Sequence, residues 1–394
     1  MRILTAIALI AACISLAACS TTTRTSQSPP PETEPAAAEP QPAEKTAPEP
    51  EPVSRPPIAT FPYHATALGG DYADYAALMQ LIDRLEQDEG FDREYLYGVF
   101  SRVEREQWIL DYLNRPRGTG KPRPGAWTRY RKKFITDQRI SKGLRFWEQY
   151  ADDLARAEAA YGVPAEYIVS ILGVETHYGG YVGQHKVINA LSTLAFDYPR
   201  RADFFTDELT HFLAMSRAEG LDPLGPIGSY AGAMGLGQFM PSSFRNYAVD
   251  FDGDGRRDLW NPVDAIGSVA NYFVGYGWRS GEPVAFTAVA RGQAPRLMKA
   301  DYTSRYTPEK LADSGVLSSV PLDGHHEVSL LRLSSNDGPE YWIGLHNFYV
   351  ITRYNHSTYY AMAVHQLAET LRDRVAQPRG PVLSQAAAPA ATAR

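Results

Sequence analysis

The sequence feature that most constrains the fold and chemistry of this chain is a helix with a carboxylate in its apolar stripe. The segment Pro164–Tyr178 reads as a helix that has its proline at the first position and extends to the glycine pair that follows. Ile168, Ile171 and Leu172 form an apolar stripe, and Glu175 takes the next position on it. Burial disfavours the charged form of a carboxylate, so the pKa of Glu175 should rise. The carboxyl group would then keep its proton near neutral pH and could act as a general acid. The alternative is a structural glutamate paired with an arginine or with backbone amides.

Length and composition narrow the class of protein. The chain has 394 residues, enough for two or three domains, and its hydrophobic content of 44% supports a sizeable core. A formal net charge of −6 gives no indication of nucleic-acid binding. The 9 histidines are scattered, without HExxH or regular His/Cys spacing, so a zinc enzyme is not supported.

The N-terminus has the pattern of a bacterial lipoprotein signal. A positive start precedes the apolar stretch Ile3–Leu16, which is too short for a good membrane span. Leu16–Cys19 resembles a lipobox, so we expect a signal peptide over 1–18 and lipidation of Cys19. Ser20 after the cysteine points to the outer membrane, facing the periplasm. An ordinary cleaved signal peptide is the alternative.

Composition divides the rest of the chain. Residues 19–57 carry the lipidated cysteine and a tether rich in Pro, Glu and Ala, and roughly 38 such residues in extended form span on the order of 100 Å. The body reads as mainly α (α+β). We expect an N-terminal helical region over 58–125, a helical core over 126–282, a small β-rich insertion over 283–335, the C-terminal part of the core over 336–376 and a disordered tail over 377–394.

Periodicity predicts the individual elements of the body. Helix-type patterns cover Asp71–Glu89, Asp92–Asn114, Gln138–Tyr161, Pro164–Tyr178, Lys186–Phe196, Arg200–Ser216, Pro262–Tyr276 and Tyr359–Val375. Alternation and β-branched residues indicate strands within Pro283–Ala290 and Val316–Leu333. Asp92 is a plausible N-cap, and another helix should begin at Pro241.

The stretch Asp250–Trp260 has the spacing of an EF-hand-like metal loop. A glycine stands at position 6 for the sharp turn, and the candidate oxygen ligands are Asp250, Asp252, Asp254, the Arg256 carbonyl and Asp258. Position 12 is Asn261 instead of the usual bidentate glutamate. We therefore expect Ca²⁺ with a structural role, and the alternative is a solvated acidic turn without an ion. A single loop does not support a calcium sensor.

Several motifs, in order along the chain, resemble those of one enzyme family. ETHYGGYVG from Glu175, GSYAGAMGLGQFMPSSF from Gly228, and the downstream DLWN and RYN motifs are similar to signatures of lytic transglycosylases, which cleave the glycan strands of peptidoglycan. The resemblance runs from about Phe61 to about Leu371. It implies a lysozyme-like fold for the helical core and a structural calcium in the acidic loop.

The resemblance also implies a reaction. Glu175 would donate its proton to the β-1,4 bond between N-acetylmuramic acid (MurNAc) and N-acetylglucosamine (GlcNAc). As a base it would then take the proton of the C6 hydroxyl, whose oxygen closes on C1 to give a 1,6-anhydroMurNAc end. No water is consumed, so the enzyme would be a lyase with a single general acid/base.

Further site residues follow from the same resemblance. Ser229 and Gln238 would hydrogen-bond the acid or the substrate, and Tyr230, Met234 and Phe239 would shape the groove. The residues around the acid and the sugar subsites would be Tyr272, Tyr354, Asn355 and Tyr360. From the residues alone, the glycine-rich segment could equally be an irregular turn and Asn355 a helix N-cap. The acidic residues that follow the Glu175 motif in sequence read as loop or exposed positions; they are Asp197, Asp203, Asp207 and Glu208.

Two other functions remain open from the sequence. One is a catalytically silent peptidoglycan-binding lipoprotein that organises other wall enzymes, and the other is a muramidase that uses water. The expected partners are peptidoglycan glycan strands and the outer membrane through the lipid anchor, with no nucleic acid. Complexes for cell-wall synthesis or hydrolysis are the assemblies that such an anchored enzyme would join.

Overall fold

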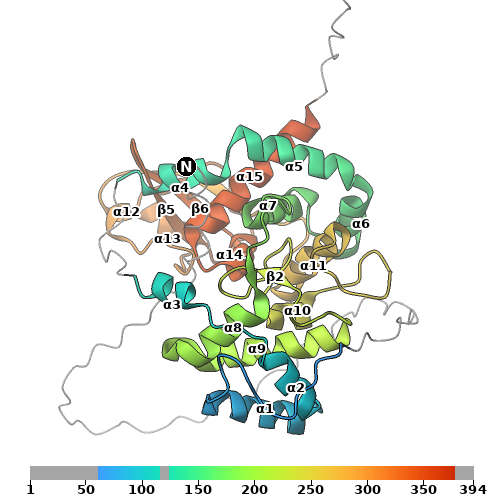
Figure 1. The fold of residues 1–394 in the computed structure, drawn as a ribbon. Coiled ribbons are helices and arrows are strands. Elements are labelled where there is room, and N and C mark those ends of the chain that lie inside the picture. The colour runs from blue at the N-terminus through green and yellow to red at the C-terminus, as the bar shows by residue number, and fades with distance from the viewer. Residues whose placement is uncertain (1–60, 116–123, 378–394) are drawn as a thin grey trace, which may run out of the picture. The chain divides into compact units, whose positions relative to one another are not determined.

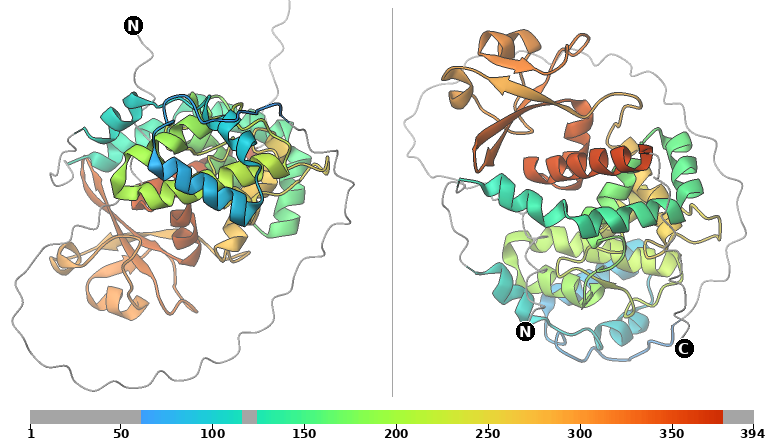
Figure 2. Two further views of the ribbon diagram at one scale, coloured as in Figure 1. Left: turned by 60° about the horizontal axis from the view of Figure 1, so that its bottom comes forward. Right: turned by 90° about the horizontal axis from the view of Figure 1, so that it is seen from above.

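The computed structural model describes residues 61–115 and 124–377 (Figure 1, Figure 2). These residues belong to one compact unit of the chain, which covers Arg55–Arg394. The expected signal peptide, Cys19, the tether and the tail beyond Gln377 lie outside the described residues. No helix within the described ranges is both long enough and apolar enough to cross a membrane.

Three short helices form the N-terminal region: α1 (Ala76–Glu89), α2 (Arg93–Phe100) and α3 (Gln107–Leu113). Asp92 caps α2 as expected, because its side chain accepts the amide of Tyr95. The helix expected from Asp71 begins only at Ala76, after a turn.

The single helix expected over 92–114 was wrong, because the chain leaves helical geometry between α2 and α3. The amides of Glu104, Arg105 and Glu106 bind side chains of distant residues there, which are Asn189, Asp71 and Thr193 respectively. These tertiary bonds replace intrahelical ones, so local periodicity did not reveal the break.

The next three helices are α4 (Ala126–Phe134), α5 (Asp137–Gln149) and α6 (Ala151–Tyr161). Sequence periodicity missed α4 and predicted one helix over 138–161. The prediction was wrong at Tyr150, whose φ of −115° and ψ of 32° divide α5 from α6. Thr136 starts α5 by accepting the amide of Arg139.

The helical core is built around α7 (Ala165–Thr176), which packs against α5, α6, α11 and α15. The other core elements are α8 (Val187–Asp197), the 3₁₀ turn η2 (Pro199–Arg201), α9 (Ala202–Ala218), α10 (Pro241–Tyr247) and α11 (Pro262–Gly275). The expected helix starts at Pro241 and Pro262 are confirmed. A two-residue ladder joins β1 (His185–Lys186) to β2 (Ile227–Gly228).

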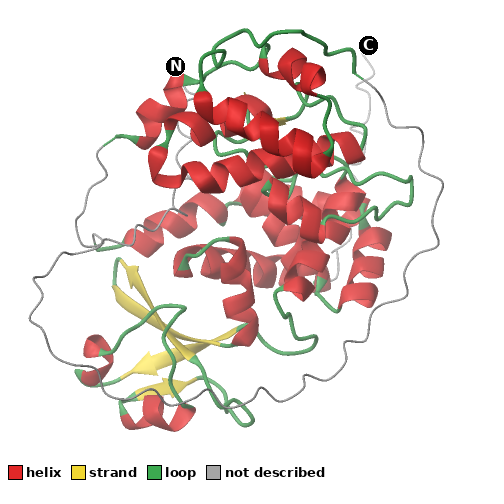
Figure 3. Ribbon diagram, turned by 90° about the horizontal axis from the view of Figure 1, so that it is seen from below, coloured by secondary structure: helices red, strands yellow, loops and turns green. Residues whose placement is uncertain are grey.

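A four-stranded antiparallel sheet forms the β-rich part, which Figure 3 shows grouped apart from most helices. Its strands are β3 (Ala285–Ala290), β4 (Val316–Ser318), β5 (Ser329–Ser335) and β6 (Gly338–Gly344), in the order β4-β3-β6-β5. Two short helices, α12 (Ala294–Leu297) and α13 (Pro308–Asp313), lie between the strands in sequence. The core of this part includes Leu311, Val316, Leu330 and Ile343.

The sheet extends beyond residue 335, at which we expected the β-rich insertion to end. Strand β6 pairs with β3 and β5 and lies in the segment that we assigned to the helical core. The expected strand within 316–333 is two strands, β4 and β5, separated by a connection without regular structure. The chain then returns to the helical core through α14 (His346–Tyr354) and α15 (Thr358–Ala376).

Candidate active site

Glu175 lies in the last turn of α7, where the sequence placed it. Ile168, Ile171 and Leu172 are fully buried, whereas Glu175 retains part of its exposure. Burial raises the pKa of Glu175 to about 7, against a smaller lowering by the hydrogen bond from Tyr360. In the described part of the chain no arginine or lysine forms an ion pair with Glu175, so the paired structural glutamate is not what the structure contains.

Tyr360 donates its hydroxyl to Glu175. The distance from its Oη to Oε1 of Glu175 is 2.5 Å. Ser357 caps α15 and accepts the amide of Tyr360, which fixes the first turn from which the phenol projects. Burial and the nearby Glu175 charge hold the pKa of Tyr360 well above its ordinary value, so its hydroxyl remains a donor.

Tyr354 and Tyr272 stand next to this pair. Tyr354 donates to the carbonyl of Gly237 at 2.8 Å, and Tyr272 donates to the carbonyl of Arg353 at 2.8 Å. Their ring centres are 4.5 Å apart. Burial raises the pKa of Tyr354, and the Glu175 charge raises it further, which places this phenol within electrostatic reach of the acid. The two tyrosines tie the glycine-rich loop, residues 229–240 between β2 and α10, to α11 and α14.

Ser229 shapes the glycine-rich loop from inside. It is buried, and its hydroxyl oxygen accepts the amides of Ala231 and Ala233 at 3.3 and 3.0 Å. Met234 and Phe239 are also buried and pair through their backbones. Met234 and Phe239 therefore support the loop from the core, and their expected part in shaping a groove stays a prediction.

Gln238 and Asn355 each have a buried side-chain amide oxygen that accepts no hydrogen bond. Gln238 has a φ of 52°, and its Nε2 donates to the carbonyls of Val182 and Gly235, both at 3.1 Å. The Oε1 of Gln238 and the Oδ1 of Asn355 have no hydrogen-bond partner. Asn355 does not cap α15, because Ser357 does. Two unpartnered buried acceptors next to the tyrosines call for donors from a ligand or from water.

The turn after Glu175 is unusual because two successive residues other than glycine are left-handed. His177 and Tyr178 have φ values of 56° and 60°. The helix thus ends at Thr176, earlier than the expected glycine pair. Thr176 donates its hydroxyl to the carbonyl of Leu236 at 2.8 Å, which connects the helix end to the glycine-rich loop.

Tyr178 fills a slot between two glycines. A Cβ on Gly143 of α5 would lie 2.4 Å from the Tyr178 Oη, and one on Gly173 of α7 would lie 2.5 Å from it. The Oη is buried and has no hydrogen-bond partner. The fit of this ring holds the segment that follows Glu175 against α5. Sequence reasoning missed it, since glycines inside two helices are its only local signal.

The structure brings together three of the expected metal ligands. Carboxylate oxygens of Asp250, Asp252 and Asp254 lie within 4.8 Å of one another. Asp258 is not in this group, and its Oδ1 accepts the amide of Trp260. The amide of Arg256, whose carbonyl was the expected ligand, donates to Asp254. Three clustered carboxylates and a turn of this type fit a calcium ion.

Asp264 organises this loop and escaped the sequence analysis. It is buried and accepts the amides of Phe251, Asp252 and Asp258. Asn261, at position 12 of the loop, caps α11 and donates its side-chain amide to Asp252. An aspartate in the first turn of a helix that follows an acidic loop is the signal that could have identified Asp264.

Two acidic residues that we expected at loop or exposed positions have tertiary partners. Glu208 is buried and accepts both the amide and the hydroxyl of Ser242, so its predicted exposure was wrong. Asp197 binds Arg105 and Tyr75. Across the described residues, no second carboxylate contributes to the pKa of Glu175.

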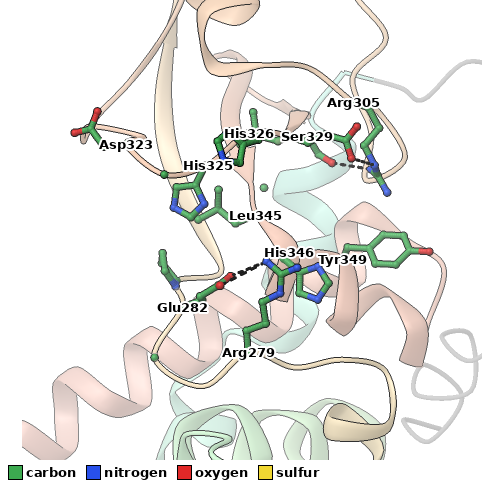
Figure 4. A pocket seen from close by; sticks show the side chains of 16 residues that line it. Arg279, Glu282, Arg305, Asp323, His325, His326, Ser329, Leu345, His346 and Tyr349 are labelled. Atoms are coloured by element: carbon green, nitrogen blue, oxygen red, sulfur yellow. Dashed lines mark hydrogen bonds and ion pairs between the residues drawn. The ribbon is translucent and has the colours of Figure 1, made fainter. Parts of the chain in front are cut away.

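A polar cavity of about 650 Å³ lies elsewhere, between the start of α14 and the β-rich part (Figure 4). Its arginines already have acidic neighbours: Arg279 with Glu282 at 3.4 Å, and Arg305 with Glu327 at 3.1 Å. None of the predicted site residues lines it. The cavity is therefore separate from the site around Glu175.

Comparison with known proteins identifies the family. Residues 74–369 match the model of the Transglycosylase SLT domain. Membrane-bound lytic murein transglycosylase B of Escherichia coli (strain K12) is 49% identical over 314 residues, which are 78% of this chain and 86% of that protein.

Two solved structures extend the likeness to the fold. Escherichia coli lytic transglycosylase Slt35 in complex with calcium has a TM-score of 0.74 and 49% identity, over 79% of this chain and 97% of that one. SltB3 from Pseudomonas aeruginosa in complex with NAG-anhNAM-pentapeptide has a TM-score of 0.66 and 32% identity, over 75% of this chain and 80% of that one. The expected mainly helical, lysozyme-like fold is confirmed. The chain belongs to the family of SLT-domain transglycosylases.

Proposed function

We propose that this chain is a lytic transglycosylase that cleaves the MurNAc–GlcNAc β-1,4 bond of peptidoglycan and leaves 1,6-anhydroMurNAc ends. The observation that carries the proposal is the partly buried Glu175, whose pKa of about 7 lets it give and retake a proton near neutral pH. Family membership and the names of the relatives support the same reaction class.

In the first step Glu175 protonates the glycosidic oxygen, and the bond from that oxygen to C1 of MurNAc breaks. GlcNAc leaves with a free hydroxyl, and C1 becomes positive. The N-acetyl oxygen of the same sugar stabilises C1. Glu175 is now a carboxylate, and the hydroxyl of Tyr360 is in place to donate to its Oε1.

In the second step the Glu175 carboxylate takes the proton of the C6 hydroxyl. The C6 oxygen forms its bond to C1, which closes the 1,6-anhydro ring and returns Glu175 to its protonated state. The two proton transfers balance, and no water enters the product. A nucleophile tethered within the sugar has an entropic advantage over water.

The remaining predicted residues are proposed to hold the sugar. The unpartnered Oε1 of Gln238 and Oδ1 of Asn355 are suited to accept hydroxyl or N-acetyl N–H groups. Tyr354 keeps part of its exposure and can pack on a sugar, whereas Tyr272 is buried and supports the Tyr354 ring. Ser229 keeps the glycine-rich loop in shape.

The absence of a nearby second carboxylate supports a single acid/base. Glycosidases that use water or a covalent intermediate place two carboxylates on either side of the bond. Of the residues that the structure describes, only Glu175 acts as an acidic neighbour in raising the pKa of Tyr354 and of Tyr360. A muramidase that uses water would need another group to act as the general base that activates the water.

The acidic loop is proposed to hold a structural calcium through Asp250, Asp252 and Asp254, with the Arg256 carbonyl and Asp258 completing the set. The clustered oxygens support this. A solved structure of the related Slt35 is a complex with calcium.

The chain is further proposed to be an outer-membrane lipoprotein that faces the periplasm, anchored at Cys19. The signal-like N-terminus supports this, and one relative is named membrane-bound. The proposed layout keeps the tether over 19–57 between the anchor and the catalytic body. Cys19→Ser should move the protein out of the membrane fraction while its intrinsic activity persists. Retention after a salt wash would point to another anchor.

Product analysis of digested sacculi tests the reaction. The expected muropeptides end in 1,6-anhydroMurNAc and are lighter by one water than hydrolytic products. Digestion in ¹⁸O-water should leave these ends unlabelled. Labelled reducing ends as the main product would instead establish a muramidase, and no cleavage by folded protein would favour a silent binding lipoprotein.

A further inference from the structure

Three basic side chains gather beside the end of α7 that carries Glu175. Arg139 and Lys142 are three residues apart on α5, so they share a face of that helix, which packs against α7 (Figure 1). His177 forms the C-cap of α7. A Cβ on Gly180 would lie 3.1 Å from the Lys142 Nζ and 3.7 Å from the His177 Cδ2, so these side chains meet over Gly180. We call Arg139, Lys142 and His177 the cationic cluster.

Arg139 is held in place by neutral groups only. Its Nη1 donates to the carbonyl of Lys133 at 2.5 Å, and its guanidinium carbon lies 5.1 Å from the centre of the Phe134 ring. The Nε is buried and has no hydrogen-bond partner. Burial lowers the pKa of Arg139; the nearby Tyr178 phenol opposes this shift, and no carboxylate contributes to it.

No carboxylate within residues 61–115 and 124–377 forms an ion pair with the cationic cluster. A comparable arginine elsewhere in the fold is compensated: the Nε of Arg257 donates to the buried Glu219 at 2.9 Å. A partly buried guanidinium without a counter-ion is costly, because its desolvation is not offset.

Arg139 and Lys142 also act on His177, the third member of the cationic cluster. Burial lowers the pKa of His177, and the charges of Arg139 and Lys142 lower it further. All three side chains keep part of their exposure, so a ligand can reach them. An anion bound among them would offset the desolvation of Arg139 and favour the protonated form of His177.

We infer that the cationic cluster binds a carboxylate of the peptide that MurNAc carries on its lactyl group. The inference rests on the proposed function. His177 is only two residues from Glu175, so an anion at this position belongs to the substrate whose bond is cleaved. The glycan backbone with its peptides in place is neutral, and the carboxylates of the peptide are the anionic groups of the polymer.

The cationic cluster binds substrate and does not take part in the chemical step. The pKa of Glu175 is set by burial and by Tyr360, with no contribution from Arg139 or Lys142. Loss of the cluster should therefore raise KM and leave kcat nearly unchanged.

Three glycan substrates and matched charge variants test the inference. The substrates are peptide-bearing strands, the same strands with peptide carboxylates converted to neutral amides, and amidase-treated strands that keep only the lactyl carboxylate. Lys142→Met and Arg139→Met should each lower kcat/KM about tenfold on peptide-bearing strands, mainly through KM, since one charge-assisted bond is lost. Neither should change kcat/KM on the other two substrates.

Arg145→Met is the control, because Arg145 is an exposed cation on the same helix. It removes the same charge and should leave kcat/KM on all three substrates unchanged. Lys142→Arg keeps a cation and should retain most of the preference for peptide-bearing strands. Thermal unfolding of each variant separates lost binding from lost folding.

Equal losses on all three substrates would overturn the inference, and so would a loss that persists on amidase-treated strands. A binding measurement keeps it separate from the reaction. Glu175→Gln protein, titrated by calorimetry, should bind peptide-bearing fragments about tenfold more tightly than the amidated ones, and Lys142→Met in that background should abolish the difference. If the wild type cleaves none of the strands, the proposed function fails while this measurement still decides the inference.

Discussion

The hydroxyl of Tyr360 donates to the Oε1 of Glu175 at 2.5 Å, across 185 residues of sequence. Two opposing effects set the pKa of Glu175. Burial raises the pKa of Glu175, and the hydrogen bond lowers it, with the net result of about 7. A pKa near neutral suits the proposed mechanism, in which the same carboxyl is an acid in one step and a base in the next.

Tyr360→Phe should shift the pH dependence of kcat/KM. Glu175 must be protonated to start the reaction, so activity of the wild type should fall as pH rises through about 7. Without the hydroxyl, the pKa of Glu175 rises, so this limb should move to higher pH while the maximal rate falls about tenfold or more. An unchanged limb in a folded variant would remove Tyr360 from its role in setting the acid.

Glu175→Gln should abolish cleavage and stabilise the fold in a pH-dependent manner. The folded pKa of about 7 lies above the ordinary 4.5, so the stability associated with the protonated group is present below 4.5 and is lost as pH rises to about 7. At pH 8 the amide should therefore stabilise by up to ~3 kcal/mol relative to wild type, and much less at pH 4. Unfolding curves at both pH values check the sign, and residual turnover would contradict the single-acid mechanism.

Gly173→Ala should lower kcat by displacing Tyr178. The new Cβ would lie 2.5 Å from the Tyr178 Oη, and this overpacking should cost about 1–3 kcal/mol of stability. Since Glu175 follows two residues later, its bond to Tyr360 should lengthen and the pH profile should change as well.

Tyr178→Phe is the control for that slot. The Oη that this substitution removes has no hydrogen-bond partner in the wild type. The single variant should therefore remain close to wild type in activity and stability. Combined with Gly173→Ala it should recover part of the loss. If the double variant is as impaired as Gly173→Ala, contact with the Oη is not the cause.

Removal of calcium should destabilise the fold more than it slows the reaction. An ion that binds only the native state contributes about 2.7 kcal/mol when free ion is roughly 100 times its dissociation constant. Chelator should therefore lower the Tm, and Asp250→Asn should make the Tm nearly insensitive to calcium. Asp258→Asn should have a smaller effect, because Asp258 lies outside the cluster of three carboxylates. A Tm that does not respond to calcium in metal-free wild type would exclude a structural ion.

Short-range patterns in the sequence determined much of this protein. The apolar stripe placed Glu175 at a partly buried helix position, the spacing of Asp250, Asp252 and Asp254 placed three carboxylates in one turn, and Asp92 marked a helix start. Each of these depends on residues within a few positions of one another, where helix and turn geometry alone sets the distances.

Tertiary structure decided what surrounds those residues. The phenol of Tyr360 reaches Glu175, the ring of Tyr178 enters the slot between Gly143 and Gly173, and β6 joins the sheet instead of the helical core. Distant side chains bind the backbone amides between α2 and α3 and so end a helix that periodicity would continue. Such contacts join residues far apart in the chain, and their free energy exists only once the core has packed, so no local pattern encodes them.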